Sequence, residues 1–336
     1  MMNRFNTRSL PILRRHEYGL TLIELMVAMM IGLFLALGSV TVFTQSRASY
    51  RTSDAQARLQ ENLRFVMDTM EPDIRLARFW GLHNEPALVN VPGGFVVNCA
   101  GNNATPLALT LTQEVAAVDE SIGYVAGVPC PAANVARPDS DVLIVRHVSQ
   151  QPVPPTPGRL QIRSDLGASD LFNNGINPLG YGPLAQTHDL VVNVYYVDNG
   201  SNLDPTLPSL RRWTLDGAGN LVDEEMIAGV ENLQVQFGVD ENGPDINNLF
   251  SITRYVDGNH PIITPGAPGF LPNAEIVAVR LWVLMRTEQT ELGVTDLAVY
   301  TSPDADLGPI NPGGVAYPQN VRRQLITKTI HLRNNR

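Results

Sequence analysis

The stretch from Gly19 to Phe43 reads GLTLIELMVAMMIGLFLALGSVTVF, and it determines how the rest of the chain is interpreted. From Leu25 to Phe43 the sequence has about 19 consecutive residues without a charge. As an α-helix these residues would extend for about 28 Å, which is close to the ~30 Å hydrocarbon core of a bilayer. The stretch therefore predicts a helix that spans a membrane near the amino terminus.

Two residues of this stretch are unusual for a simple membrane span. Gly19 lies at the boundary between a polar leader and the apolar run, and Glu24 lies just inside the run. A carboxylate at the centre of a bilayer costs about 2.5–3.5 kcal/mol, and less near the interface, so such residues usually have a partner. Two interpretations of Glu24 stay open: its side chain extends toward the lipid headgroups, or it pairs with another molecule.

The string from Gly19 to Phe34 resembles the processing and methylation signature of type IV prepilins and pseudopilins. The resemblance implies that a prepilin peptidase cuts after Gly19 and then methylates the new terminal amine of Leu20. Family members usually have phenylalanine where this chain has Leu20, which is a mild departure. Glu24 falls on the family's glutamate, which implies pairing with the free amine of a neighbouring subunit. A buried acid and a buried amine are each costly alone and much less so when paired, so the pair would act as an assembly check.

Other export signals compete with this interpretation. An ordinary secretory signal could use Arg14–Arg15, the apolar run and a cut after Gly38, and would release a soluble periplasmic protein. Glu24 is awkward in the apolar core of such a signal. The Arg14–Arg15 pair is a weaker twin-arginine signal, because polar residues follow it. The arginines before the apolar run favour a cytoplasmic amino terminus, although other arginines follow the run closely.

The helical pattern continues beyond the apolar run. From Gln45 to about Phe79, apolar side chains recur at steps of three and four residues, which predicts an amphipathic helix packed on a folded body. The stripe consists of Leu59, Leu63, Val66, Met67, Met70, Ile74 and Ala77. Pro72 should kink or end the helix near its last turns, and Gly81 is a suitable stop. The apolar run and the amphipathic extension together would form a helix about 90 Å long.

The remainder of the chain has the pattern of a β-rich domain. Several segments alternate apolar and polar residues, as half-buried antiparallel strands do. The predicted strands are Asp141–Val148, Leu190–Val197, Leu210–Leu215, Val230–Val239, Glu275–Arg286 and Val321–Leu332. Residues Asp216–Asn220 (DGAGN) predict a hairpin turn. Stretches rich in proline and glycine near 150–158, 258–272 and 302–318 predict irregular loops.

Four blocks of sequence are similar to the PilW family of minor pilins. They are Phe65–Gly81, Gly229–Asp240, Val277–Thr287 and Val321–Asn334. The resemblance implies a minor pilin that joins other minor and major pilins in a complex that initiates pilus assembly and lies at the tip, often with a large adhesin. The J-type pseudopilin of type II secretion is similar in layout and remains an alternative.

Charge and cysteine content restrict the function further. The net charge is −9, and trimming at Gly19 leaves about −12. A surface this acidic argues against general nucleic-acid binding, which needs a cationic face. The two cysteines, Cys99 and Cys130, match no metal or redox motif. In an oxidising compartment they would form a disulfide that contributes about 3–4 kcal/mol in the chain-entropy model; in a reducing one they are two unrelated buried thiols.

The sequence offers little chemistry of the kind that catalysis needs. It has no HExxH, GxSxG or P-loop string, and its six histidines are scattered. We therefore expect no enzyme, no cofactor and structural roles for His147 and His188. The loop with Asp240, Asn242 and Asp245 resembles a calcium loop only loosely and is expected to be a turn. A membrane-anchored periplasmic enzyme is the alternative of a different class.

These observations lead to one predicted architecture. The fold class is α+β, with a long amino-terminal helix whose second half packs on a β-rich head. The expected regions are a leader at 1–19, a membrane or filament-core helix at 20–43, an amphipathic extension at 44–79 and a head at 80–336. The leader would be cytoplasmic, the helix in the inner membrane and the head periplasmic, before the subunit enters a pilus.

Overall fold

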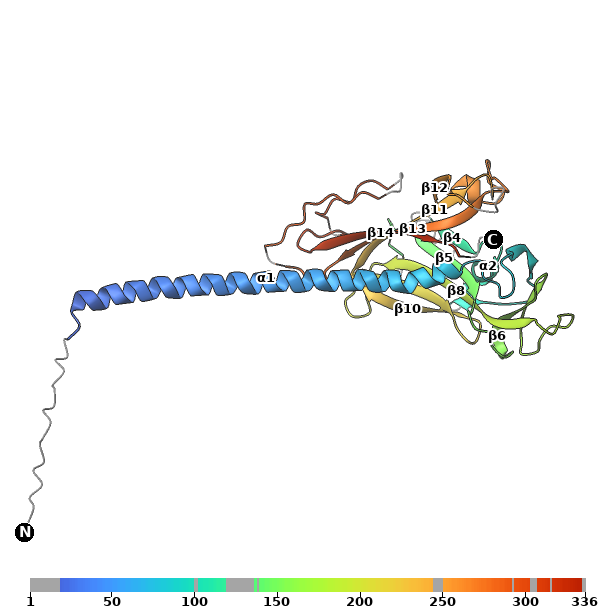
Figure 1. Cartoon of the computed structure of the whole chain (residues 1–336), viewed down its shortest axis with the longest axis horizontal. Coiled ribbons are helices and arrows are strands. Elements are labelled where there is room, and N and C mark those ends of the chain that lie inside the picture. The colour runs from blue at the N-terminus through green and yellow to red at the C-terminus, as the bar shows by residue number, and fades with distance from the viewer. Residues whose placement is uncertain are drawn as a thin grey trace, which may run out of the picture. The chain divides into compact units, whose positions relative to one another are not determined.

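We describe the protein from a computed structural model. It divides into two compact units, one up to Asp54 and one from Ala55 onward, and we treat each by itself (Figure 1). We call the second unit the head. The residues that the structure describes are 19–99, 102–118, 136–137, 139–243, 250–291, 293–302, 307–314 and 316–333.

Helix α1 extends from Leu22 to Leu76 as one continuous element. Its buried residues are the predicted stripe: Leu59, Leu63, Val66, Met67, Met70 and Ile74. Pro72 lies inside the helix and does not end it. The helix ends three residues before the predicted Phe79, and the left-handed residue that follows it is Arg78, with φ of 67°, rather than Gly81.

The larger sheet has ten strands in the described part of the chain, in the order β1-β7-β6-β8-β9-β10-β2-β3, while β5 pairs with β8 and β4 with β5. All pairings are antiparallel except β1 with β7 and β10 with β2. The strands are β1 (Val89–Asn90), β2 (Asn98–Cys99), β3 (Asn102–Asn103), β4 (Val115–Val118), β5 (Val142–Val148), β6 (Pro157–Ser164), β7 (Ser169–Asn174), β8 (Gln186–Asp198), β9 (Ser209–Leu215) and β10 (Leu221–Ala228). Two short helices precede or interrupt them: η1 (Pro86–Leu88) and α2 (Thr105–Leu109).

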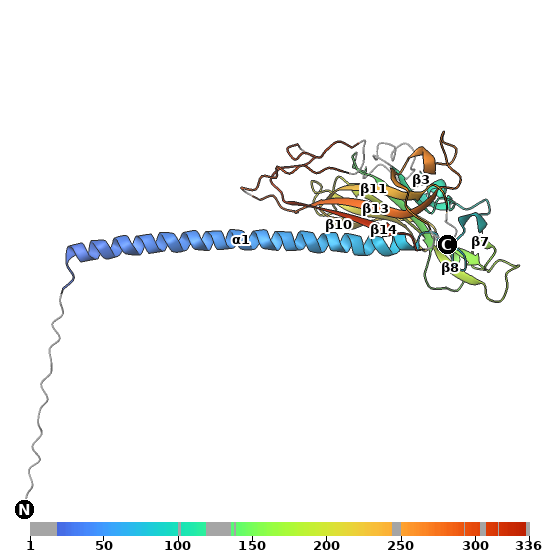
Figure 2. The same ribbon diagram turned by 45° about the horizontal axis from the view of Figure 1, so that its top comes forward.

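The second sheet is antiparallel, with strands in the order β12-β11-β13-β14 (Figure 2). Its elements are β11 (Val230–Asp240), β12 (Arg254–Asp257), β13 (Glu275–Arg286), β14 (Arg323–His331) and the short helix η3 (Pro261–Ile263) between β12 and β13. Alternate side chains of β13 belong to two different hydrophobic clusters. Val279, Leu281 and Val283 face the cluster that contains α1, whereas Trp282 and Leu284 pack with Ile310.

The main core lies where α1 meets both sheets. One cluster joins the buried stripe of α1 to apolar residues of β4, β5, β8, β9, β11, β13 and β14. A second cluster forms around Trp80, Ile144 and Tyr196. Because burying apolar area is the main favourable term in folding, this shared core is what holds the second half of α1 to the head. The predicted α+β class is confirmed.

The six predicted strands are all present, as β5, β8, β9, β11, β13 and β14. The Asp216–Asn220 turn is also present, closed by a hydrogen bond of 2.7 Å from the Asp216 amide to the Asn220 carbonyl. The structure adds strands that the sequence did not predict, of which the longest are β6, β7 and β10.

Candidate functional site

The amino-terminal end of α1 is defined by a threonine cap. Gly19 and Leu20 precede the helix, are exposed and have no regular structure. The Thr21 hydroxyl accepts the Glu24 amide at 3.3 Å, and the Thr21 carbonyl accepts the Leu25 amide at 3.1 Å. This arrangement is an N-cap with glutamate at the third helical position, the pattern of a capping box. The peptide bond between Gly19 and Leu20 therefore lies outside the helix, in backbone that a protease can reach.

Glu24 is the only charged residue between Gly19 and Ser46. It lies in the first turn of α1, where the positive end of the helix dipole favours a carboxylate. Its side chain is exposed, and no residue that the structure describes forms an ion pair with it. Once this segment is in apolar surroundings, a partner for the Glu24 carboxylate has to come from outside the described part of the chain.

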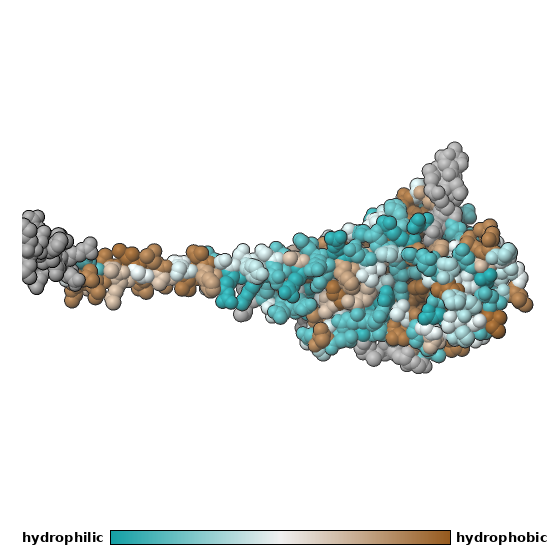
Figure 3. All heavy atoms as spheres, turned by 60° about the horizontal axis from the view of Figure 1, so that its bottom comes forward, coloured by the Kyte–Doolittle hydropathy of each residue, from teal (hydrophilic) through white to brown (hydrophobic). Residues whose placement is uncertain are grey.

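The side chains that surround Glu24 are apolar and exposed. From Leu20 to Phe43 every large hydrophobic residue is at least 48% exposed, and Leu22 reaches 77%. Figure 3 shows these apolar side chains along the first part of the helix. The helix is the one described element that is long and apolar enough to cross a membrane. So much exposed apolar surface indicates a segment that functions in lipid or against other apolar helices.

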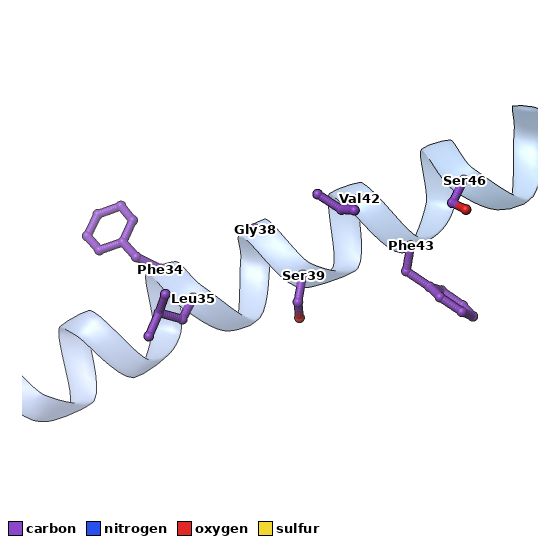
Figure 4. Close-up of a pocket in the computed structure, with 7 residues that line it drawn as sticks. All are labelled: Phe34, Leu35, Gly38, Ser39, Val42, Phe43 and Ser46. Carbon is purple, nitrogen blue, oxygen red and sulfur yellow. The ribbon is translucent and has the colours of Figure 1, made fainter.

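The few hydroxyl groups in this segment bond to their own helix. Ser39 donates to the Ala36 carbonyl at 3.0 Å, and Thr41 donates to the Leu37 carbonyl at 2.7 Å. They therefore require no outside partner, which suits an apolar environment. Beside Ser39, the missing side chain of Gly38 leaves a shallow hollow on the helix surface. Figure 4 shows its lining: Phe34, Leu35, Gly38, Ser39, Val42, Phe43 and Ser46.

Within the head, the partly buried carboxylate of Asp73 fixes the last turns of α1. Asp73 accepts hydrogen bonds from His147 Nε2 at 2.7 Å, from Asn193 Nδ2 at 3.0 Å and from the Tyr195 hydroxyl at 2.9 Å. These donors lie on the neighbouring strands β5 and β8. Burial and the adjacent carboxylate of Asp73 raise the pKa of Tyr195 well above its usual value, so the phenol stays a donor. The helix is thus tied to the centre of the larger sheet.

A second polar contact ties α1 to the other sheet. Glu71 forms an ion pair with Lys328 of β14, and the Arg75 carbonyl accepts the Arg333 amide at 3.3 Å. The hydrogen bond from Lys328 lowers the pKa of Glu71. Sequence reasoning missed the roles of Asp73 and Lys328. The one available signal was an aspartate, Asp73, between the stripe positions Met70 and Ile74.

The turn after α1 holds a compact charge cluster. Arg78 pairs with Glu275 and lies 3.6 Å from Glu114. Burial raises the pKa of Glu114, and burial lowers that of Arg146 to about 10. The Arg146 guanidinium is held by backbone carbonyls, with 3.0 Å to that of Leu107. Arg78 is thus occupied by the two glutamates and Arg146 by backbone carbonyls, as in a structural cluster.

The other residues singled out in the sequence lie apart from this site. Cys99 is fully buried in β2 and is disulfide-bonded, while Cys130 lies outside the described residues. The pairing of Cys99 with Cys130 stays a prediction. The Asp240 carboxylate accepts the amides of Asn242 at 3.0 Å and Ser251 at 2.8 Å, which is the geometry of a capped turn. Asp245, the third residue of the calcium-like loop, lies outside the described residues.

The two histidines expected to be structural lie in buried strands. His147 bonds to Asp73 as described, and His188 Nδ1 bonds to the Ser149 carbonyl at 2.7 Å. Burial lowers the pKa of His188. Among the described residues, no group of three His, Cys, Asp or Glu side chains is arranged to hold a metal ion.

Two family models match separate parts of the chain. The model of the family described as type IV pilus-assembly protein W matches residues 194–334, and the prokaryotic N-terminal methylation motif matches residues 14–40. No curated protein matches the chain. The solved structure of the type IV-like pilin TTHA1219 from Thermus thermophilus is 13% identical in sequence, with a TM-score of 0.25. The aligned region covers 61% of this chain and 81% of the TTHA1219 chain.

The two resemblances drawn from the sequence are confirmed by these family models. The methylation motif covers Gly19, Leu20 and Glu24, and the PilW match covers the strands from the end of β8 to β14. The chain thus has a region similar to the PilW family at residues 194–334 and a prepilin-type methylation motif at residues 14–40.

Proposed function

We propose that the protein is a minor pilin that takes part in type IV pilus assembly, in an initiation or tip complex with other minor pilins. Glu24 carries the proposal, because it is the single charge of the exposed apolar segment from Leu20 to Phe43. A carboxylate in that position needs a partner from outside the chain once the helix leaves water. The natural partner is the terminal amine that cleavage exposes on a neighbouring subunit.

Processing follows from the accessible backbone before the cap. A prepilin peptidase cuts between Gly19 and Leu20, and Leu20 becomes the methylated amino terminus. The cut leaves the Thr21 cap intact, so the mature helix starts at the same residue as in the precursor. The new amine and the Glu24 carboxylate then lie at the same end of each subunit, which allows neighbours in register to pair them.

The partners follow from the same argument. They are other minor and major pilins through residues 20–54, and other tip components, such as an adhesin, through the head. The amino terminus is cytoplasmic and the head periplasmic, where Cys99 and Cys130 form a disulfide. The protein acts by assembly and has no catalytic role, cofactor or nucleic-acid ligand.

The decisive test compares Glu24→Ala with Glu61→Ala, an exposed glutamate on the same helix within the head. Breaking a buried ion pair costs about 3–5 kcal/mol, so incorporation of Glu24→Ala into sheared pili should fall at least about tenfold. Cleavage at Gly19, measured by amino-terminal mass, and the amount in the membrane should not change. Glu61→Ala should behave as the parent. Normal incorporation of Glu24→Ala would contradict the proposal.

A second experiment separates the pilus from type II secretion. Deletion of the gene should abolish surface pili and twitching and should leave protein secretion intact. The match of residues 194–334 to the PilW family favours this outcome over a J-type pseudopilin. The reverse phenotype would assign the chain to the secretion machine.

A further inference from the structure

Two arginines follow the apolar segment of α1 at a spacing of one helical turn. Arg47 and Arg51 are the only charged residues between Leu25 and Ser53, and both are exposed. Like charges four residues apart on a helix repel each other. Within the part of the chain that the structure describes, neither arginine forms an ion pair. The two guanidinium groups therefore lack an anion at the place where the helix leaves the candidate membrane span.

Two aromatic residues share the face of the helix on which the arginines lie. At about 3.6 residues per turn, Phe43, Tyr50 and the two arginines fall within roughly 100° of the helix circumference. Phe43 is 61% exposed and Tyr50 is 76% exposed, and Figure 4 shows the Phe43 ring projecting from the helix. Tyrosine is enriched where a membrane meets water, because its ring is apolar and its hydroxyl is polar. We call Phe43, Arg47, Tyr50 and Arg51 the interfacial face.

The Arg47 side chain leans toward the apolar segment. Its Cζ atom lies 5.4 Å from the centre of the Phe43 ring, which is one turn nearer the amino terminus. The Cα–Cβ bonds of a helix tilt toward the amino-terminal end, so Arg51 starts in the same direction. Along the axis, Arg47 lies about 6 Å beyond Phe43 and Arg51 about 12 Å beyond it. Because basic side chains keep their stems on apolar surface and their charge in the polar layer, both guanidinium groups reach the headgroups when residues 25–43 span a bilayer.

The position of the acidic residues favours a lipid phosphate as the anion. Asp54 is the next acid along the chain, on the side of Arg51 away from the apolar segment, and it already interacts with another group. Glu24 lies at the opposite end of the span. For a subunit in a bilayer, the nearest anions to Arg47 and Arg51 are therefore the phosphates of the lipids. Anionic lipids carry no positive group beside the phosphate, and each basic residue near an anionic surface strengthens binding by about fivefold.

From these observations we infer that the interfacial face binds an anionic phospholipid, with the two guanidinium groups on the phosphate and the aromatic rings against the first part of the acyl chains. The inference goes beyond the proposed function, because it needs only that residues 25–43 lie in a bilayer. It gives Arg47 and Arg51 a ligand in the unassembled subunit.

Native mass spectrometry of the full-length protein, released from detergent micelles, tests the inference. The protein is mixed with equal amounts of phosphatidylglycerol and phosphatidylcholine that have the same acyl chains. The two lipids differ in mass only through their headgroups, so each retained lipid can be identified. Phosphatidylglycerol should be retained at least about tenfold more than phosphatidylcholine, because two basic residues act on the same phosphate.

A matched pair of double variants makes the test specific. Arg47→Gln with Arg51→Gln should reduce the retained phosphatidylglycerol to the level of phosphatidylcholine. The control is Arg58→Gln with Arg64→Gln, which removes the same charge from exposed positions of the same helix, farther from the apolar segment. The control should keep the preference of the parent. Substitutions at exposed positions have little effect on folding, and equal thermal unfolding of the two variants checks this.

Glycerophosphate separates a lipid site from a site for free phosphate. It has the charge of the headgroup without the acyl chains, so it should not displace phosphatidylglycerol when it is added at the same concentration.

Fluorescence quenching in vesicles locates the interfacial face. Tyr50→Trp adds one tryptophan to the three of the head, Trp80, Trp213 and Trp282, which are buried and supply the background that the parent measures. In vesicles of phosphatidylglycerol, bromine on acyl carbons near the headgroup should quench the added fluorescence more than bromine near the chain ends.

Several results would overturn the inference. These are equal retention of the two lipids by the parent, a preference that survives Arg47→Gln with Arg51→Gln, and a preference lost in Arg58→Gln with Arg64→Gln. Displacement by glycerophosphate, retention of a second copy of the chain in place of lipid, or stronger quenching from the chain ends would also contradict it. None of these measurements depends on pilus assembly, so the Glu24→Ala test of the proposed function has a separate outcome.

Discussion

Lys328, the single lysine of the chain, forms an ion pair with Glu71 of helix α1. The pair joins the edge strand β14 to the helix, and the Arg333 amide donates to the Arg75 carbonyl one turn further along α1. With Asp73 bound to β5 and β8, the last turns of α1 are attached to both sheets by polar contacts of defined geometry.

Lys328→Met should lower the free energy of unfolding by less than about 1 kcal/mol at pH 7, because the lysine side chain is 36% exposed and solvent screens the pair. The pKa of Glu71 is lowered in the folded state. The contribution is therefore present above the unfolded-state pKa and lost as the pH falls through the folded-state pKa. Urea unfolding in detergent should show a difference from the parent at pH 7 that shrinks as the pH is lowered below 4.5, the usual pKa of glutamate. Arg64→Met, at an exposed pair, is the control.

Asp73→Ala should be far more damaging. The substitution removes the acceptor of three buried donors, and leaving buried donors without a partner costs about 2–4 kcal/mol in total. Asp68→Ala, on the exposed side of the same helix, should cost less than about 0.5 kcal/mol. Chemical unfolding of the two variants checks the difference, and equal stabilities would refute the role given to Asp73.

Stability should fall in mild acid because of His188, which is buried, and His83, which is half-buried. Burial lowers the pKa of His188 and of His83 below the usual 6.5. Below pH 6.5 the unfolded chain binds protons that the folded chain does not, so the free energy of unfolding decreases as the pH falls. His188→Gln should reduce the loss between pH 7.5 and 5.5, whereas the exposed His331→Gln should keep the parent's profile. Thermal unfolding across this range measures it.

Gly81→Ala should destabilise the connection between α1 and the larger sheet. Gly81 has φ of 95°, and an added Cβ would lie 2.2 Å from Ser164 Oγ, which accepts the Leu82 amide. The backbone strain and the displaced hydroxyl together should cost about 2 kcal/mol or more. Gly93→Ala, where an added Cβ meets nothing within 4 Å, should be close to neutral. A thermal shift would distinguish the two.

Much of the fold could be predicted because long apolar patterns dominate it. The stripe of α1 and the strands β5, β11 and β13 have enough periodic apolar residues for their type to be read directly. Strand β10 was missed although its turn was recognised, because the consecutive acids Asp223, Glu224 and Glu225 interrupt the alternation of apolar and polar residues. Its carboxylates instead pair with Arg211 and Arg212 across the hairpin, and such pairing is visible only once strands are adjacent.

Contacts with distant parts of the chain explain the features that the sequence pattern did not predict. Alternation in β11 predicts an exposed polar face, yet every residue of the strand is buried. Asn232 and Gln234 bond to the Asp139 carbonyl, which covers that face from a distant part of the chain. In the same way α1 ends at Leu76, and Arg78 is drawn toward Glu114 and Glu275. At the amino terminus the signal is local, so Gly19, Leu20 and Glu24 could be singled out from the sequence alone, and their roles stay predictions.

The hydroxyls that bond back to their own helix have a mechanical consequence. Ser39 and Thr41 need no hydrogen-bond partner on a neighbouring molecule. When the segment slides or turns among other helices, it therefore exchanges only dispersion contacts of similar strength. Many packings of residues 25–46 are then nearly equal in energy, and the ionic contact proposed for Glu24 would select one of them. Under the proposed function, subunits can then be added or removed in small steps, because the apolar contacts between their helices are interchangeable.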